Sequence, residues 1–153
     1  MCGLEVVGVR VEMPTNQPLV LLREAEGGRY LPIWIGAVEA SAIAYAQQAT
    51  ETNRPLTHEL MQSIVLALGD ELREVRIFDV NDGVFYASLV FSSGAEVEAR
   101  PSDSIALALR SGARIVCTED VLDDAGIVST SEEDQEVEKF REFLDEVEPE
   151  DFG

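Results

Sequence analysis

The 153-residue sequence contains one histidine, one lysine and two cysteines, and each of these shortages excludes a class of site. A single histidine, His58, excludes acid–base chemistry by a histidine pair and multi-histidine zinc sites within one chain. The only lysine, Lys139, lies near the C-terminus, so a P-loop and a nuclease motif with a core lysine have no candidate. Cys2 and Cys117 form no Cys-x-x-Cys pair, which argues against a disulfide framework or a thiolate zinc site and fits a reducing cytoplasm.

Long apolar runs are missing too, and Glu5 and Arg10 interrupt the apolar N-terminus, so we expect a cytoplasmic protein that does not enter a membrane. The apolar content of 46% predicts a domain with a substantial core. The net charge is -19, and from Glu119 onward there are 15 acidic residues against two basic ones. Such a charge argues against a nonspecific nucleic-acid coat and leaves local arginine patches as candidate anion sites.

Apolar periodicity predicts a single α+β domain with a mixed, largely antiparallel sheet, three packed helices and a C-terminal acidic amphipathic helix. Strands are expected near residues 7–13, 19–22, 30–35, 75–78, 84–91, 95–100 and 115–117, and helices over 37–48, over 57–68 and from Arg100 to Gly112. We divide the chain into a domain of residues 1–125 and a helical acidic tail of residues 126–153. The tail helix is expected because four apolar residues recur at helical spacing, at Val137, Phe140, Leu144 and Val147.

Two expected helix starts, at 54–59 and at 100–103, share one sequence pattern. In both, arginine and proline are followed by a hydroxyl residue and a charged first turn. Ser102 and Thr57 are the expected caps, and Asp103 is placed to face the positive end of the helix dipole. Spare amides at helix starts suit anionic ligands. The alternative is that both caps are purely structural.

Seven polar residues at or near the expected helix starts form the candidate cluster: Glu39, Arg54, His58, Glu59, Arg100, Ser102 and Asp103. Carboxylates can hold Mg²⁺ or Mn²⁺, arginines can hold a phosphate, and a histidine can move a proton. In the alternative interpretation the carboxylates only satisfy helix dipoles or pair with arginines. A Ser102–His58–Asp103 triad is disfavoured because no Gly-x-Ser-x-Gly elbow surrounds the serine.

Five motifs in order resemble the bifunctional nuclease domain family over roughly the first 125 residues: 9–14 (VRVEMP), 31–40 (LPIWIGAVEA), 54–60 (RPLTHEL), 82–86 (DGVFY) and 100–108 (RPSDSIALA). The resemblance implies an α+β fold and a phosphodiesterase acting on DNA or RNA. The matching positions are Trp34, Glu39, Arg54, His58, Glu59, Arg100, Ser102 and Asp103. Among these we assign base stacking to Trp34 and a share of phosphate binding to Ser102.

The resulting hypothesis is a metal-dependent nuclease. Mg²⁺ or Mn²⁺ held by Glu39, Glu59 and Asp103 activates water, and Arg54 and Arg100 neutralise the phosphate. The catalytic residues are His58, which assists proton transfer, Glu39 and Asp103. The alternative is a non-catalytic oligomeric module that binds an anionic ligand or a protein partner at helix N-termini. Converging carboxylates would favour the enzyme, and carboxylates tied to arginines would favour the module. A homodimer is also expected, from the alanine-rich helix 37–48 and the apolar stripe of the tail.

Overall fold

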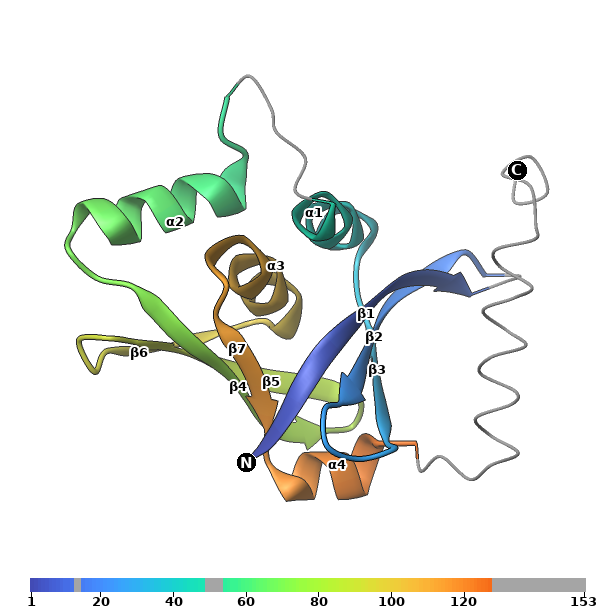
Figure 1. Ribbon diagram of the computed structural model, residues 1–153. Coiled ribbons are helices and arrows are strands. Elements are labelled where there is room, and N and C mark those ends of the chain that lie inside the picture. Colours follow the sequence, from blue (N-terminus) through green and yellow to red (C-terminus); the bar gives the residue numbers. More distant parts are fainter. Residues whose placement is uncertain (13–14, 49–53, 128–153) are drawn as a thin grey trace.

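Seven strands and four helices make up the part of the chain that the computed structural model describes, residues 1–12, 15–48 and 54–127 (Figure 1). The strands are β1 (Cys2–Glu12), β2 (Gln17–Glu24), β3 (Tyr30–Trp34), β4 (Leu72–Asn81), β5 (Val84–Phe91), β6 (Glu96–Ala99) and β7 (Arg114–Cys117). The helices are α1 (Ala37–Gln47), α2 (Thr57–Ala67), α3 (Pro101–Ser111) and α4 (Glu119–Ala125). The α+β fold predicted from the sequence is confirmed.

All seven strands belong to one sheet, in the order β3-β2-β1-β7-β4-β5-β6. Only the β4–β7 pair is parallel, so the sheet is mixed and largely antiparallel, as predicted. The short strand β7 joins two halves, a β1–β2–β3 meander and a β4–β5–β6 meander (Figure 1).

The hairpins of the two meanders follow the turn chemistry of the sequence. Asp82 and Gly83 connect β4 to β5 with φ values of 52° and 79°, which is the double left-handed conformation of a tight hairpin turn. Pro32 lies in β3, which among the seven described strands pairs with β2 alone and is an edge strand, so the missing N–H of proline costs no ladder bond.

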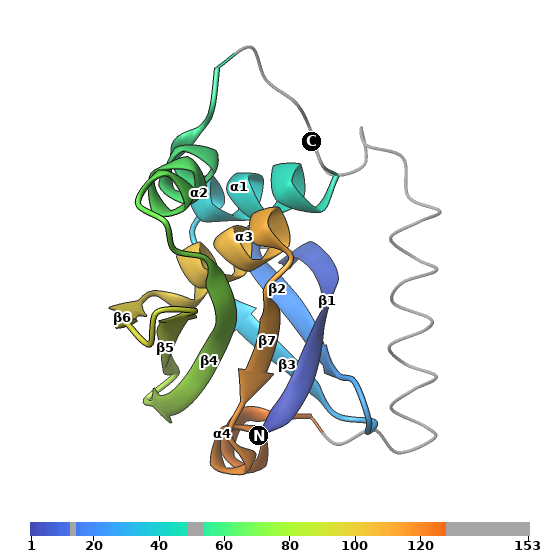
Figure 2. The same ribbon diagram turned by 60° about the vertical axis from the view of Figure 1, so that its left-hand side comes forward.

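Helix α3 is the centre around which the other helices are arranged. Figures 1 and 2 show α1 and α2 on one side of α3, while α4 lies at the opposite end of the molecule. Six of the eleven residues of α3 are buried, and they meet the inner faces of both meanders in one core. The first turn of α3 therefore sits where three helices and the sheet come together.

The ends of α3 show why the helix lies where it does. Pro101 takes the first helical position, where its missing N–H is harmless, and Gly112 ends the helix in the left-handed conformation at φ 76°. The expectation that Ser102 and Thr57 are caps is wrong. Both residues lie inside their helices, and the N-cap positions belong to Arg100 and Leu56, without a side-chain cap hydrogen bond.

Helix α4 was not expected from the sequence. Thr118 caps it by accepting a hydrogen bond from the Val121 N–H, and Glu119 and Asp120 occupy its first turn. The predicted tail helix through Val137 lies outside the described residues. No helix within the described residues is both long and apolar enough to span a membrane.

Candidate functional site

Arg100 connects the first turns of α1 and α3. Its Nη1 lies 3.0 Å from Oε1 of Glu39 in α1, and its Nε and Nη2 lie 3.0 and 2.9 Å from Oδ2 of Asp103 in α3. Hydrogen bonding to Asp103 and the charge of that carboxylate, followed by the same effects of Glu39, raise the pKa of Arg100 above its ordinary value. The guanidinium is therefore a fixed cation with two carboxylates against it.

His58 extends this network to α2. Its Nε2 lies 3.0 Å from Oδ1 of Asp103, and the imidazole is mostly buried. An ionised carboxylate can only accept a hydrogen bond, so Nε2 is the donor in this pair. Four of the residues selected from the sequence thus form one chain of contacts, from Glu39 through Arg100 and Asp103 to His58.

A cleft of about 400 Å³ lies beside this network, and Trp34, Arg100 and Ser102 line it. Trp34 is 55% exposed, although indole is an apolar group. A second hollow of about 450 Å³ shares Trp34 and Phe85 with the cleft, so the indole borders both hollows. An exposed aromatic ring and a guanidinium in one cleft are the pair of groups that base stacking and phosphate binding require.

Two helix starts border the same cleft. Gly36, the N-cap of α1, and Pro101 and Ser102 of α3 are among its lining residues, and neither N-cap makes a side-chain hydrogen bond. First-turn amides of a helix lack partners within the helix and carry a partial positive charge. These amides favour binding of an anionic group in the cleft and offset part of the negative charge of the neighbouring carboxylates.

Gly36 leaves room for the close approach of the Glu39 carboxylate. A Cβ atom at position 36 would overlap the carboxylate of Glu39, which folds back over the start of α1. Glycine at this position thus allows the carboxylate that holds Arg100 to lie against the cleft wall.

Two further predicted residues come from α2 and from the segment that precedes it. Glu59 of α2 forms an ion pair with Arg110 of α3, whose Nη1 lies 3.0 Å from its Oε1. This oxygen is buried and has no hydrogen-bond partner, so the contact is ionic without hydrogen-bond geometry. Arg54 is exposed, three residues before α2 begins.

A known protein family matches the part of the chain that contains this site. The model of the bifunctional nuclease domain matches residues 20–130, a range that includes Trp34, the α1 start, His58 and the α3 start. The chain belongs to the bifunctional nuclease domain family. Family membership suggests a nuclease-related function and nucleic acid as a binding partner.

Two curated proteins of Mycobacterium tuberculosis are similar to this bifunctional nuclease domain chain over almost its whole length. They are the uncharacterized proteins MT1877, of strain CDC 1551 / Oshkosh, and Rv1829, of strain ATCC 25618 / H37Rv. Each is 54% identical to the chain, and the match covers 99% of this chain and 98% of the relative.

The carboxylates of this bifunctional nuclease domain do not fit the single metal site expected from the sequence. Among the described residues, no three His, Cys, Asp or Glu side chains are grouped so that they could hold a metal ion. Arg100 binds both Glu39 and Asp103, so a guanidinium already neutralises that pair. Glu59 is engaged by Arg110. The assignment of Mg²⁺ or Mn²⁺ to these three residues stays a prediction. Between Glu39 and Asp103, where the sequence predicted a metal ion, the structure has the guanidinium of Arg100.

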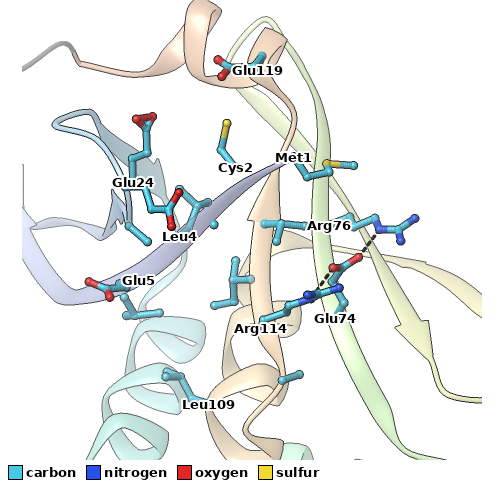
Figure 3. Close-up of a pocket in the computed structure, with 17 residues that line it drawn as sticks. Met1, Cys2, Leu4, Glu5, Glu24, Glu74, Arg76, Leu109, Arg114 and Glu119 are labelled. Atoms are coloured by element: carbon cyan, nitrogen blue, oxygen red, sulfur yellow. Dashed lines mark hydrogen bonds and ion pairs between the residues drawn. The ribbon is translucent and has the colours of Figure 1, made fainter.

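A larger hollow in the described part of the bifunctional nuclease domain lies elsewhere. It measures about 990 Å³ and follows the first residues of β1 beside β4 and β7 (Figure 3). Figure 3 shows Glu74 between Arg76 and Arg114, and the buried Glu74 carboxylate binds the Nε of both, with 2.7 Å to Arg114. None of the residues selected from the sequence lines this hollow, and its buried charge is already paired.

Sequence reasoning did not assign a role to two residues that shape the cleft, Gly36 and Phe85. Both lie inside motifs that carry the resemblance, 31–40 and 82–86. The glycine between a strand and a helix and the aromatic residue after a tight turn were available signals. Only the fold shows that both belong to the wall beside Trp34.

Proposed function

We propose that the chain is a nuclease that binds a single-stranded segment of DNA or RNA in the Trp34 cleft and hydrolyses a phosphodiester there. The observation that carries the proposal is that the exposed indole of Trp34 and the guanidinium of Arg100 line the same cleft. Stacking of a base on an aromatic side chain contributes ~1–3 kcal/mol per base, and it is available to unpaired bases. The net charge of -19 opposes long polyanions, so short single strands are the favoured substrates.

The proposed roles follow from how each side chain is held. Arg100 binds the phosphate, since its pKa stays high and its orientation is fixed by Glu39 and Asp103. Ser102 offers its hydroxyl from the cleft wall, and Arg54 is a second phosphate ligand from the start of α2. These contacts would neutralise charge as it develops on the phosphate, which is the largest contribution in many such sites.

Proton transfer is assigned to the His58–Asp103 pair. Neither His58 nor Asp103 is among the residues that line the cleft, and Asp103 lies between His58 and Arg100, which does line it. We therefore propose that His58 acts through Asp103 rather than directly on the substrate. No step is assigned to a metal ion, because the carboxylates present do not fit one site.

The test is an assay of binding and cleavage with short fluorescent DNA and RNA strands. Trp34→Ala should weaken binding roughly 5- to 100-fold, the equivalent of one lost stacked base. Arg100→Ala should weaken binding. It should also make the slope of log binding constant against log salt concentration shallower by about 0.7 per lost phosphate contact. Glu39→Gln, His58→Ala and Asp103→Asn should lower cleavage more than binding.

Matched controls separate the cleft from general surface effects. Arg114→Ala removes an arginine whose side chain is 72% exposed, against 65% for Arg100, and Tyr45→Ala removes a half-exposed aromatic residue from α1. Both control variants should bind like the wild type. Cleavage is measured with Mg²⁺, with Mn²⁺ and with EDTA, and against a mock purification that reports contaminating nuclease. Cleavage that survives all three network substitutions, or never exceeds the mock, would sink the assignment.

A second candidate is the non-catalytic binding module, and one observation favours it. Glu39 and Asp103 are both tied to Arg100, and Glu59 is tied to Arg110, which is the arrangement expected of anion binding without hydrolysis. This alternative predicts strand binding that depends on Trp34 and Arg100 with no cleavage under any metal condition.

A further inference from the structure

Helix α2 faces the solvent with its apolar side. His58 contacts Asp103 and Glu59 contacts Arg110, so the charged side chains of α2 point toward α3. At about 100° per residue, Leu60 and Ile64 lie on the opposite side of the helix. Helix α2 also has inward apolar residues, since Met61 and Val65 line a hollow of about 200 Å³ against β5 and α3. A surface helix normally keeps its other face polar, and α2 does not.

The outward face consists of four large aliphatic residues spaced four apart, which we call the α2 stripe: Leu56, Leu60, Ile64 and Leu68. Their exposure runs from 42% at Leu56 to 80% at Leu68. None of the eleven residues of α2 is buried. Isolated helices shorter than ~12–15 residues are marginal in water and depend on packing, so α2 needs a covering surface.

We propose that the α2 stripe binds the α2 stripe of a second copy of this chain in an antiparallel, two-fold symmetric pair. The reason to commit to a second copy is charge. The chain carries a net charge of -19, yet residues 60–69 contain no charged side chain. Two copies with this net charge repel one another at long range, and this uncharged face is one where they can meet without opposing charges.

The spacing of the stripe fits self-packing. Residues four apart form a ridge that packs into the matching groove of another helix, and the small Ser63 and Ala67 beside the ridge provide that groove. With Ile64 on the two-fold axis, Leu60 of one copy meets Leu68 of the other. The sequence placed oligomerisation on helix 37–48 and on the apolar stripe of the tail, which lies outside the described residues. Because α1 turns Ala40, Ile43 and Ala46 into the core, we favour α2.

The stripe spans about 18 Å from Leu56 to Leu68 at 1.5 Å per residue. A single helix stripe of this length buries less surface than the ~800 Å² per partner of a standard interface. The dimer should therefore dissociate on dilution. Light scattering of the full chain should give twice the chain mass at tens of micromolar and the single mass at nanomolar concentration.

Two charge variants test the pairing. Leu60→Glu should raise the dimer dissociation constant at least about 100-fold, because the symmetry places an unpaired carboxylate at two positions of the interface. Leu60→Glu combined with Leu68→Lys should restore the dimer, since the two new charges meet across the axis only in the antiparallel arrangement. Val38→Glu on α1 is the matched control, with 81% exposure against 80% for Leu68, and should leave the mass unchanged.

A variant that dissociates because it unfolds is recognised by circular dichroism, and Ile64→Cys offers an independent measurement. In a Cys2→Ser background a thiol at the axis should form a disulfide-linked dimer with a mild oxidant such as glutathione disulfide, and Val38→Cys should not. A wild-type monomer at tens of micromolar, which is expected if residues 128–153 or another protein cover α2, overturns the proposal. So does a Leu60→Glu dimer, or dissociation by Val38→Glu alone.

Discussion

Cys117 illustrates how much a single position depends on distant parts of the chain. It has no exposed surface and lies directly opposite Cys2 across the β1–β7 ladder, although 114 residues separate the two in sequence. The sequence shows only two widely spaced cysteines without a motif. Their neighbourhood follows from strand pairing, which no local pattern encodes.

Burial raises the pKa of the Cys117 thiol to about 12. Because the thiolate is the reactive form, we expect Cys117 to resist maleimide in the native protein at pH 8, whereas both cysteines react after denaturation. Counting thiols by mass spectrometry in the native and denatured states checks this. Labelling of native Cys117 at the denatured rate would contradict it.

The same thiol adds a pH dependence to stability. Its pKa is higher in the folded than in the unfolded chain, so its contribution is fully present below about pH 8.5 and is lost as the pH rises toward 12. The free energy of unfolding of the wild type should therefore fall more steeply above pH 8.5 than that of Cys117→Ala. Urea denaturation at pH 8, 9 and 10 compares the two slopes, and parallel slopes would refute the assignment.

At the scale of the element, α3 was the helix whose limits could be predicted best. Pro101 and Gly112 have conformations that follow from covalent geometry alone, and the structure places the helix between them. What could not be predicted is that Arg100 occupies the cap position, whereas Ser102 lies inside the first turn and lines the cleft. A helix over 57–68 was predicted from the sequence too, but which of its faces turns outward depends on the partners that α3 offers to His58 and Glu59.

Gly112 allows a test of how strongly its backbone conformation fixes the end of α3. Its φ is 76°, and an added Cβ would meet no atom within 4 Å, so Gly112→Ala changes only the backbone preference. We expect a loss of ~1 kcal/mol in the free energy of unfolding, which is the usual cost of the left-handed region for a residue with a side chain. Gly3→Ala is the control, because φ is not positive there and the nearest contact is an ordinary 3.8 Å. Urea denaturation should show the loss only at position 112.

For the whole molecule, the two meanders were foreseeable and their connection was not. Alternation and the Asp82–Gly83 turn indicate the hairpins locally. The position of β7 between β1 and β4 brings together strands from both ends of the domain, and a four-residue strand carries too little pattern to reveal its neighbours. The candidate site has the same limitation, because Trp34, His58 and Arg100 come from separate motifs that only the assembled fold brings close.

The central place of β7 makes a strong prediction about truncation. A chain that ends at residue 113 lacks Ile115 and Cys117 from the core and leaves β1 and β4 without their shared neighbour. We expect that chain to be cut rapidly by a protease, whereas a chain that ends at residue 127 resists it. A time course of limited proteolysis on both, with circular dichroism of each, makes the comparison. Equal resistance would show that the meanders fold without β7.

The pairing of β1 with β7 also has a consequence during synthesis, because the two strands are made at different times. At ~5–20 residues per second, the ribosome takes roughly 5 to 20 s to extend the chain from the end of β1 to the end of β7. During that time β1 presents an unpaired edge, which is the kind of surface that joins other nascent chains. The first strand to leave the ribosome thus waits for the last, so growing chains should depend on a chaperone that shields edges until residue 117 has emerged.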